Sequence, residues 1–204
     1  MEYYLKGEYA KLANDINLAI SYFQKADSLD PNSALIHAEI AECYFKNNDN
    51  SMANSHYLIS LEKSNYSNDI GNKVLTFYDS INDSLHSREV LDSLIFYNPT
   101  ELDFRFKKVS YAFLDKNYDT LLNEYKSIFY IDPENNDILV KMTEIGFALE
   151  KYDLIEELFL QISTDFPDLT QPLLALSSLN IKNDNFIDGI FLIEKAYKIS
   201  NDES

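Results

Sequence analysis

The 204-residue sequence is poor in the residues that build cofactor and metal sites. It has one cysteine, Cys43, only four glycines and no tryptophan. A single thiol forms neither an internal disulfide nor a zinc site of several thiolates. Neither GxGxxG nor GxxxxGK[ST] occurs, which excludes mononucleotide and dinucleotide binding through those phosphate loops. We therefore expect the protein to carry no cofactor.

Histidine is also scarce, and its placement does not indicate catalysis. His37, His56 and His86 are scattered, without an HExxH motif, whereas a metal site needs several ligands on one face. Cys43 lies beside apolar residues with no histidine base that the pattern would bring near it, which favours a packing role over a nucleophile. We predict no metal site, no catalytic residue and no enzymatic activity.

Positive charge is in short supply. Lys and Arg total 17 against 34 Asp and Glu, so the net charge is −17. Such a chain is repelled by nucleic-acid phosphates and by anionic membrane surfaces. No apolar run approaches the roughly 20 residues of a membrane-spanning helix. We therefore expect no nucleic-acid partner and no membrane insertion.

The sequence begins with neither a basic segment nor a continuous apolar one, so no export signal is visible. A soluble protein is the expectation, with a cytoplasmic location favoured. A periplasmic or other exported location stays open, because a signal removed earlier would leave no trace.

The content of hydrophobic residues, 46%, is sufficient to form a core.

A 34-residue period runs through the whole chain. Pro31, Pro99, Pro133 and Pro167 are separated by multiples of 34, and Asn65 and Asn201 occupy the two remaining points. Six such steps account for all 204 residues. A fixed period of this length is typical of repeat proteins, in which each repeat is one supersecondary unit.

Within each repeat the apolar residues have helical spacing. One column is always large and apolar, another lies four residues earlier and a third lies three residues later, which together form one helix stripe. The large column consists of Phe23, Tyr57, Leu91, Tyr125, Phe159 and Ile193. The pattern predicts helix pairs at 2–13 and 16–29, 33–47 and 50–63, 68–81 and 84–97, 101–115 and 118–131, 135–149 and 152–165, and 169–182 and 186–200.

Polar residues and prolines mark the helix ends. Short polar side chains precede most second helices, where they can accept a bond from a free backbone N–H. These expected N-caps are Asp15, Asp49, Asp83, Asn117 and Asn185. The four prolines of the 34-residue period should end the second helices, whereas Pro172 should fall in the first turn of a helix, where proline is tolerated.

The repeat resembles the tetratricopeptide repeat family over the whole chain. The first repeat carries Gly7, Ala19, Phe23 and Ala26, followed by LDP at 29–31, in the order and spacing of that family. The resemblance implies an all-α fold, a right-handed superhelical solenoid of antiparallel helix hairpins. It also implies a single domain at 1–204, with units at about 1–33, 34–67, 68–101, 102–135, 136–169 and 170–203. The family's usual tryptophan is absent, which leaves the subfamily open.

In this family the first helix of each hairpin lines a concave groove that binds an extended or helical peptide. Transferred position by position, the resemblance places these residues in the groove: Tyr4, Glu8, Lys11, Glu39, Glu42, Phe45, Asn72, Lys73, Thr76, Asp79, Phe106, Lys107, Ser110, Phe113, Lys141, Glu144, Phe147, Leu174, Ser178 and Ile181. We expect Phe106, Phe113 and Phe147 to act as aromatic anchors. The alternative is that they pack against neighbouring helices.

Three acid–base pairs recur at the 34-residue step, each with the acid four residues before the lysine. The lysines are Lys73, Lys107 and Lys141. Helix-surface ion pairs of this kind contribute about 0.2–0.5 kcal/mol each, and solubilising pairs are the favoured interpretation. A ladder of lysines that meets acidic groups of a ligand is the alternative.

The last helix differs from its predecessors. Ile187 and Phe191 occupy positions where the first repeat has Asn17 and Ser21. End repeats normally present a polar outer face. We expect either that the polypeptide continues or that this end contacts another chain, with two-fold pairing of two copies as a hypothesis.

Together these observations predict a non-catalytic scaffold or adaptor that binds a peptide or helix of a partner protein in its groove. The competing hypothesis is a structural subunit of a homo- or hetero-oligomeric assembly, held by contacts of the end repeat and the convex face. Fold alone does not decide between them, because function resides in the surface.

Overall fold

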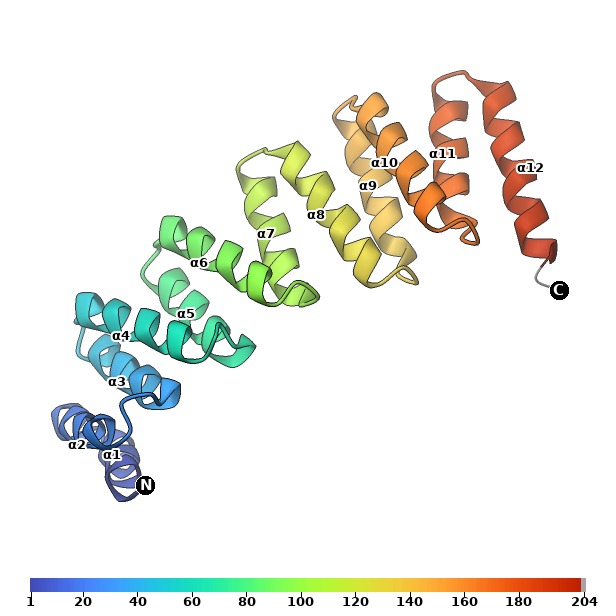
Figure 1. Ribbon diagram of the computed structural model, residues 1–204. Coiled ribbons are helices and arrows are strands. Elements are labelled where there is room, and N and C mark those ends of the chain that lie inside the picture. Colours follow the sequence, from blue (N-terminus) through green and yellow to red (C-terminus); the bar gives the residue numbers. More distant parts are fainter. Residues whose placement is uncertain (203–204) are drawn as a thin grey trace. The chain divides into compact units, whose positions relative to one another are not determined.

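Twelve α-helices make up most of residues 1–202, the part of the chain that our computed structural model describes, and no strand occurs there (Figure 1). In order they are α1 (Glu2–Leu12), α2 (Ile16–Leu29), α3 (Ala34–Lys46), α4 (Asn50–Lys63), α5 (Asn68–Ser80), α6 (Ser84–Tyr97), α7 (Leu102–Leu114), α8 (Tyr118–Ile131), α9 (Asn136–Ala148), α10 (Tyr152–Asp165), α11 (Gln171–Lys182) and α12 (Phe186–Asp202). The predicted all-α class is confirmed, and every expected helix is present with ends within two residues of the prediction.

The expected polar caps hold the starts of the second helices. Asp15, Asp49, Asp83 and Asn117 each accept a bond from the backbone N–H three residues later, at 3.1–3.2 Å. Asn185 directly precedes α12. Pro172 lies in the first turn of α11, as expected, and the four prolines of the 34-residue period directly follow the C-caps of their helices. The spacing of polar residues and prolines in the sequence was therefore sufficient to predict the helix ends.

Three residues join the two helices of every hairpin, and the middle one has left-handed backbone geometry. These residues recur at the 34-residue step, with φ between 54° and 61°: Asn14, Asn48, Asn82, Lys116, Glu150 and Asp184. The N–H of the next residue bonds to a carbonyl five residues earlier, as from Asp49 to Tyr44 at 2.9 Å. This is the Schellman end of a helix, which favours glycine or asparagine at the left-handed position.

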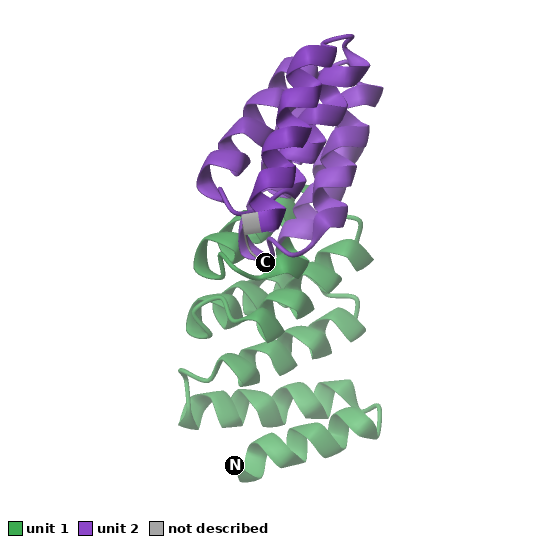
Figure 2. Cartoon of the chain, turned by 90° about the vertical axis from the view of Figure 1, so that its right-hand side faces the viewer, with its two compact units in different colours: residues 1–104 green, residues 105–204 purple. Residues whose placement is uncertain are grey.

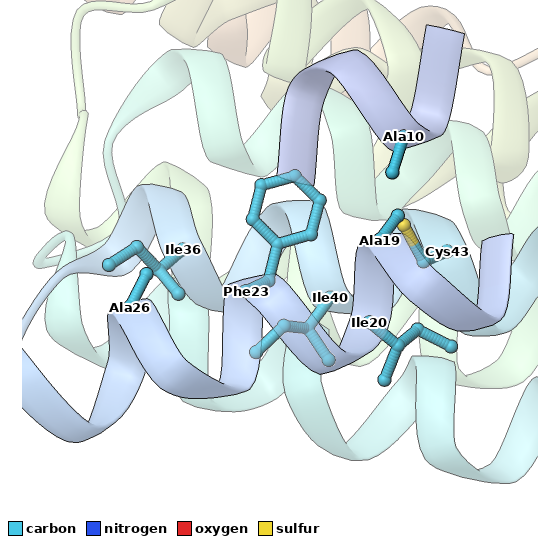
Figure 3. Close-up of a cluster of buried hydrophobic side chains, with 8 residues drawn as sticks. All are labelled: Ala10, Ala19, Ile20, Phe23, Ala26, Ile36, Ile40 and Cys43. Carbon is cyan, nitrogen blue, oxygen red and sulfur yellow. The ribbon is translucent and has the colours of Figure 1, made fainter. Parts of the chain in front are cut away.

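The helices form two compact units, Met1–Phe104 and Arg105–Ser204 (Figure 2). In the first unit, Phe23 of α2 is fully buried among Ile36 and Ile40 of α3 (Figure 3). A Cβ at Gly7 would lie 2.6 Å from the Phe23 ring, so only glycine lets α1 approach α2 this closely.

The second unit has a core of the same kind. The fully buried side chains of its second helices α8 and α10 include Ile128, Phe129, Ile155, Phe159 and Ile162. They occupy the same columns as the buried residues of the first unit. Within each unit, a hairpin thus buries its second helix against the first helix of the next one.

A histidine pair connects α3 and α4 in the first unit. The Nδ1 atoms of His37 and His56 are 3.2 Å apart, and His37 Nε2 lies 3.2 Å from an Asp27 carboxylate oxygen. The Tyr44 ring stacks on His56 at 5.6 Å. Burial lowers the pKa of His56 below its ordinary 6.5, and His37 lowers it further, against the opposing effect of Asp27.

We predict that this histidine makes stability depend on pH. Because the folded-state pKa of His56 is below the unfolded-state value, the unfolded chain binds the proton more readily as pH falls through 6.5. The free energy of unfolding should therefore be lower at pH 5.5 than at pH 7.5, and His56→Gln should reduce that difference. Tyr44→Phe is the control, since it removes no titrating imidazole. An equal pH dependence in His56→Gln and the parent, measured by urea unfolding, would contradict the prediction.

The hairpin turns give a second prediction. Glu150 is exposed and holds a left-handed φ of 54°, which strains a residue with a Cβ. Glu150→Gly should raise the free energy of unfolding by about 0.5–1 kcal/mol. The matched control is Glu157→Gly on the exposed face of α10, which should lower it by about as much. If both variants lose stability in chemical denaturation, relief of backbone strain at residue 150 does not outweigh the entropy that glycine adds to the unfolded chain.

Candidate functional site

In the first unit, a hollow of about 430 Å³ lies between the first helices α3 and α5. It brings together five predicted groove residues, Glu42, Phe45, Asn72, Lys73 and Thr76, and also Lys46, Tyr57, Phe77 and Ser80. The Phe77 ring meets Phe45 edge-on at 5.4 Å and lies 5.0 Å from Tyr57. The hollow therefore has an aromatic base beneath a polar rim.

Beside this hollow, charged side chains of three first helices meet at Glu39, which is 5% exposed. The ammonium group of Lys11 donates to Glu39 and lies 3.4 Å from Glu42. Lys73, which the sequence pairs with Asp69, lies 3.4 Å from Glu39. A buried carboxylate is stable only when it is paired, so α1 and α5 both stabilise the charge that α3 carries.

The pKa values follow from these pairs. Burial alone would lower the pKa of Lys11, but the hydrogen bond to Glu39 and the surrounding carboxylates outweigh it, so the pKa is raised. Burial opposes ionisation of Glu42, yet Lys46 and Lys11 hold its pKa below 4.5. Both groups are thus charged at neutral pH. The side chains of Lys46 and Lys73 keep 44% and 42% of their surface exposed, which leaves two ammonium groups at the rim of the hollow.

The second unit has a larger hollow, about 560 Å³, between the first helices α9 and α11. Its residues are Asn136, Leu139, Val140, Thr143, Glu144, Phe147, Gln171, Leu174, Ala175, Ser178 and Lys182. Val140 is 54% exposed and Leu174 is 45% exposed. The Lys182 ammonium lies 3.6 Å from the centre of the Phe147 ring, a cation–π contact. This hollow combines aliphatic side chains and one aromatic ring with polar groups, and its charged residues are Glu144 and Lys182.

A smaller hollow of about 340 Å³ lies between α7 and α8 and includes the predicted residues Ser110 and Phe113. Phe113 is 61% exposed. Phe106 is half-buried, and the Lys107 ammonium lies 5.6 Å from the Tyr111 ring. Of the three expected anchors, Phe113 and Phe147 therefore line hollows, and Phe106 lines none of the three.

Other predicted groove residues lie outside the hollows. Tyr4 packs against the core, with its ring 5.7 Å from that of Phe23. Glu8 lies 3.3 Å from the Lys11 ammonium, and Lys141 is exposed on α9. Asp79 and Ile181 are exposed near the ends of α5 and α11.

Sequence reasoning missed two contributors that the repeat could have indicated. Val140 belongs to the same column as Phe106 and Leu174, which were predicted. Four of the six members of another column, one position after Phe113 and Phe147, also line the hollows: Lys46, Ser80, Leu114 and Lys182. The 34-residue step gives the signal for both.

Cys43 belongs to the core of the first unit. Cys43 is fully buried, and burial raises the pKa of its thiol to about 11. Within residues 1–202 no group of three or more His, Cys, Asp or Glu side chains is placed to hold a metal ion. Over the same residues, no helix has the length and apolar character that crossing a bilayer requires.

The helix hairpins have the repeat length and order of tetratricopeptide repeats. No family model and no curated protein matches the sequence. Among solved structures, the Cut9–Hcn1 hetero-tetramer of the APC/C is similar at 14% identity and a TM-score of 0.45, over 98% of this chain and 39% of its own.

Two further solved structures are similar. YrrB, described as a TPR protein with an unusual peptide-binding site, shares 14% identity over 98% of this chain and 86% of its own, with a TM-score of 0.46. The MamA protein shares 12% identity over 98% of this chain and 90% of its own, with a TM-score of 0.38.

The buried thiol gives a prediction about reactivity. With a pKa of about 11, roughly one Cys43 thiol in a thousand is ionised at pH 8, and the thiolate is the nucleophile. Cys43 should react with Ellman's reagent about 100-fold more slowly in the native protein than in guanidinium. Ser51→Cys, at an exposed position of α4, supplies a control thiol that should react at once. Rapid labelling of native Cys43 would contradict its assignment to the core.

Proposed function

We propose that this protein is a non-catalytic scaffold that binds a peptide segment of a partner protein along the first helices of its hairpins. The observation that carries the proposal is the hollow between α9 and α11. It combines exposed aliphatic side chains, Val140 and Leu174, with the aromatic ring of Phe147 and one lysine. Exposed apolar groups gathered in a concave site with a polar rim are typical of protein–protein contacts.

The two larger hollows suit different kinds of ligand group. The hollow of the second unit offers aliphatic walls for a large apolar side chain. The hollow of the first unit has an aromatic base, with Lys46 and Lys73 at its rim. Apolar anchors would supply affinity, and charges would supply register and selectivity. With a net charge of −17, a protein is a better candidate for the ligand than a nucleic acid.

A structural subunit of an assembly is the second candidate function. The observation in its favour is the exposure of large apolar side chains on α12, where Ile187 is 84% and Phe191 is 64% exposed. The two functions need different surfaces, since neither of these residues lines the hollow between α9 and α11. Each function can therefore be tested with variants that leave the other surface intact.

Selection of peptides from a phage library against the full chain tests groove binding. We expect the enriched peptides to share one or two large apolar residues. Leu174→Asp should weaken their binding about tenfold or more, because it places a charge in the hollow. Leu160→Asp is the matched control: Leu160 is 50% exposed on α10 and lies outside the hollow, so binding should be unchanged.

Affinities are read by fluorescence anisotropy, after circular dichroism shows the same helix content in each variant. Binding that is equally strong to Leu174→Asp and to the parent would place recognition elsewhere. Phe45→Asp then reports whether the hollow of the first unit contributes, because Phe45 lines only that one of the described hollows.

A further inference from the structure

The last helix exposes residues that earlier second helices bury. Ile193 is 43% exposed, whereas its equivalents Phe23, Tyr57, Leu91, Tyr125 and Phe159 are between 0% and 9% exposed. Tyr197 is 69% exposed, and its three apolar equivalents, Leu61, Ile95 and Phe129, are at most 9% exposed. With Phe186 and Ile190, 54% and 55% exposed, these residues form an inner strip on α12. Within each unit, the first helix of the next hairpin covers this face of the preceding second helix.

A second apolar strip lies beside the first. Ile187 and Phe191, the outer strip, are 84% and 64% exposed. The equivalents of Phe191 are polar in every earlier hairpin, and Leu85 is the one apolar equivalent of Ile187. The apolar surface of α12 is therefore wider than the contact between consecutive hairpins uses.

The two strips together indicate which kind of partner covers α12. A helix seated as α3 sits on α2 would cover the inner strip and leave Ile187 and Phe191 in water. A second copy of the chain, which presents the same two strips, would cover both the inner and the outer strip. We propose that two copies of this chain pair through α12, with the two helices antiparallel across a two-fold axis.

The available area is sufficient for such a dimer. A buried Phe or Tyr side chain removes about 150–250 Å² from water. The three aromatic and three isoleucine side chains of the strips, at the exposures given above, thus offer on the order of 600 Å² per copy, against about 800 Å² per partner in a stable interface. Neighbouring polar side chains at the rim supply the remainder.

The charges on α12 fit the antiparallel arrangement. The apolar strips run from Phe186 to Tyr197, so the two-fold axis passes beside Phe191. Asp188 and Lys195 lie equally far from that midpoint on opposite sides, and both are exposed on the same flank of the helix. Antiparallel pairing therefore brings each Asp188 opposite the Lys195 of the other copy. Glu194, between the strips, has Lys198 four residues later, a spacing that allows an ion pair.

The first test is the mass of the full chain in solution. We expect sedimentation velocity to show a monomer–dimer equilibrium at protein concentrations on the order of 1–200 µM. Ile187→Asp and Phe191→Asp should each raise the dissociation constant about 100-fold or more, because a charge would be buried in the apolar contact. The matched control is Leu85→Asp: Leu85 holds the repeat position of Ile187 in α6 and is 63% exposed, so dimerisation should be unchanged.

Either a monomer at all concentrations, which leaves the face to a different partner, or a dimer that survives both α12 substitutions would overturn the proposal. Circular dichroism establishes folding, and both substituted side chains are exposed, so neither variant removes core packing.

The second test examines the antiparallel register. Asp188→Lys and Lys195→Asp should each weaken dimerisation about fivefold or more, since each places like charges opposite one another. The double exchange restores opposite charges and should return the dissociation constant to within about twofold of the parent. If the double variant is as weak as the single ones, the antiparallel register is wrong.

Discussion

Within each unit, the structure depends on one contact, the burial of a second helix beneath the first helix of the next hairpin. A hairpin on its own cannot bury both of its apolar faces. Phe23 and Phe159, which lie in this contact in different units, are fully buried. The same requirement fixes the 34-residue step and the apolar columns, because every hairpin must present the same surface to its neighbour.

The contact leaves one side of each first helix without a structural task, and the two units use that side differently. In the first unit it carries Lys11, Glu39 and Lys73, in which one carboxylate pairs with two ammonium groups across three helices. In the second unit, Val140 and Leu174, one repeat position before the column of Glu39 and Lys73, and Lys182, one position after the column of Lys11, line an apolar hollow. Adjacent positions of the first helices therefore give a surface of ion pairs in one unit and a largely apolar hollow in the other. Such a difference is chemical rather than architectural, and it bears directly on what each unit can bind.

The helices and their ends could be predicted from the sequence, whereas contacts between side chains of different helices could not. Helix ends and N-caps such as Asp49 depend on local spacing, so the sequence was sufficient to place them. The burial of Glu39 depends on lysines from α1 and α5, and the approach of His37 to His56 joins different columns on two helices; no pattern within one helix contains that information. The membership of Lys182 in a hollow was accessible from the repeat, because Lys46 holds the same column, but only the structure shows that this column borders the cavity.

Both proposed surfaces depend on α11, which has different neighbours on its two sides. Leu174 and Ser178 face the hollow, while Ser177 donates to the carbonyl of Gly189 on α12 at 2.9 Å and is buried. Leu173, Leu176 and Leu179 are buried in the core of the same unit. Because α11 is fixed on its inner side, a charge introduced at Leu174 changes the hollow without disturbing the packing that holds α12. Peptide recognition uses exposed side chains of α9 and α11, and pairing uses exposed side chains of α12. The two proposed surfaces therefore have no exposed side chain in common.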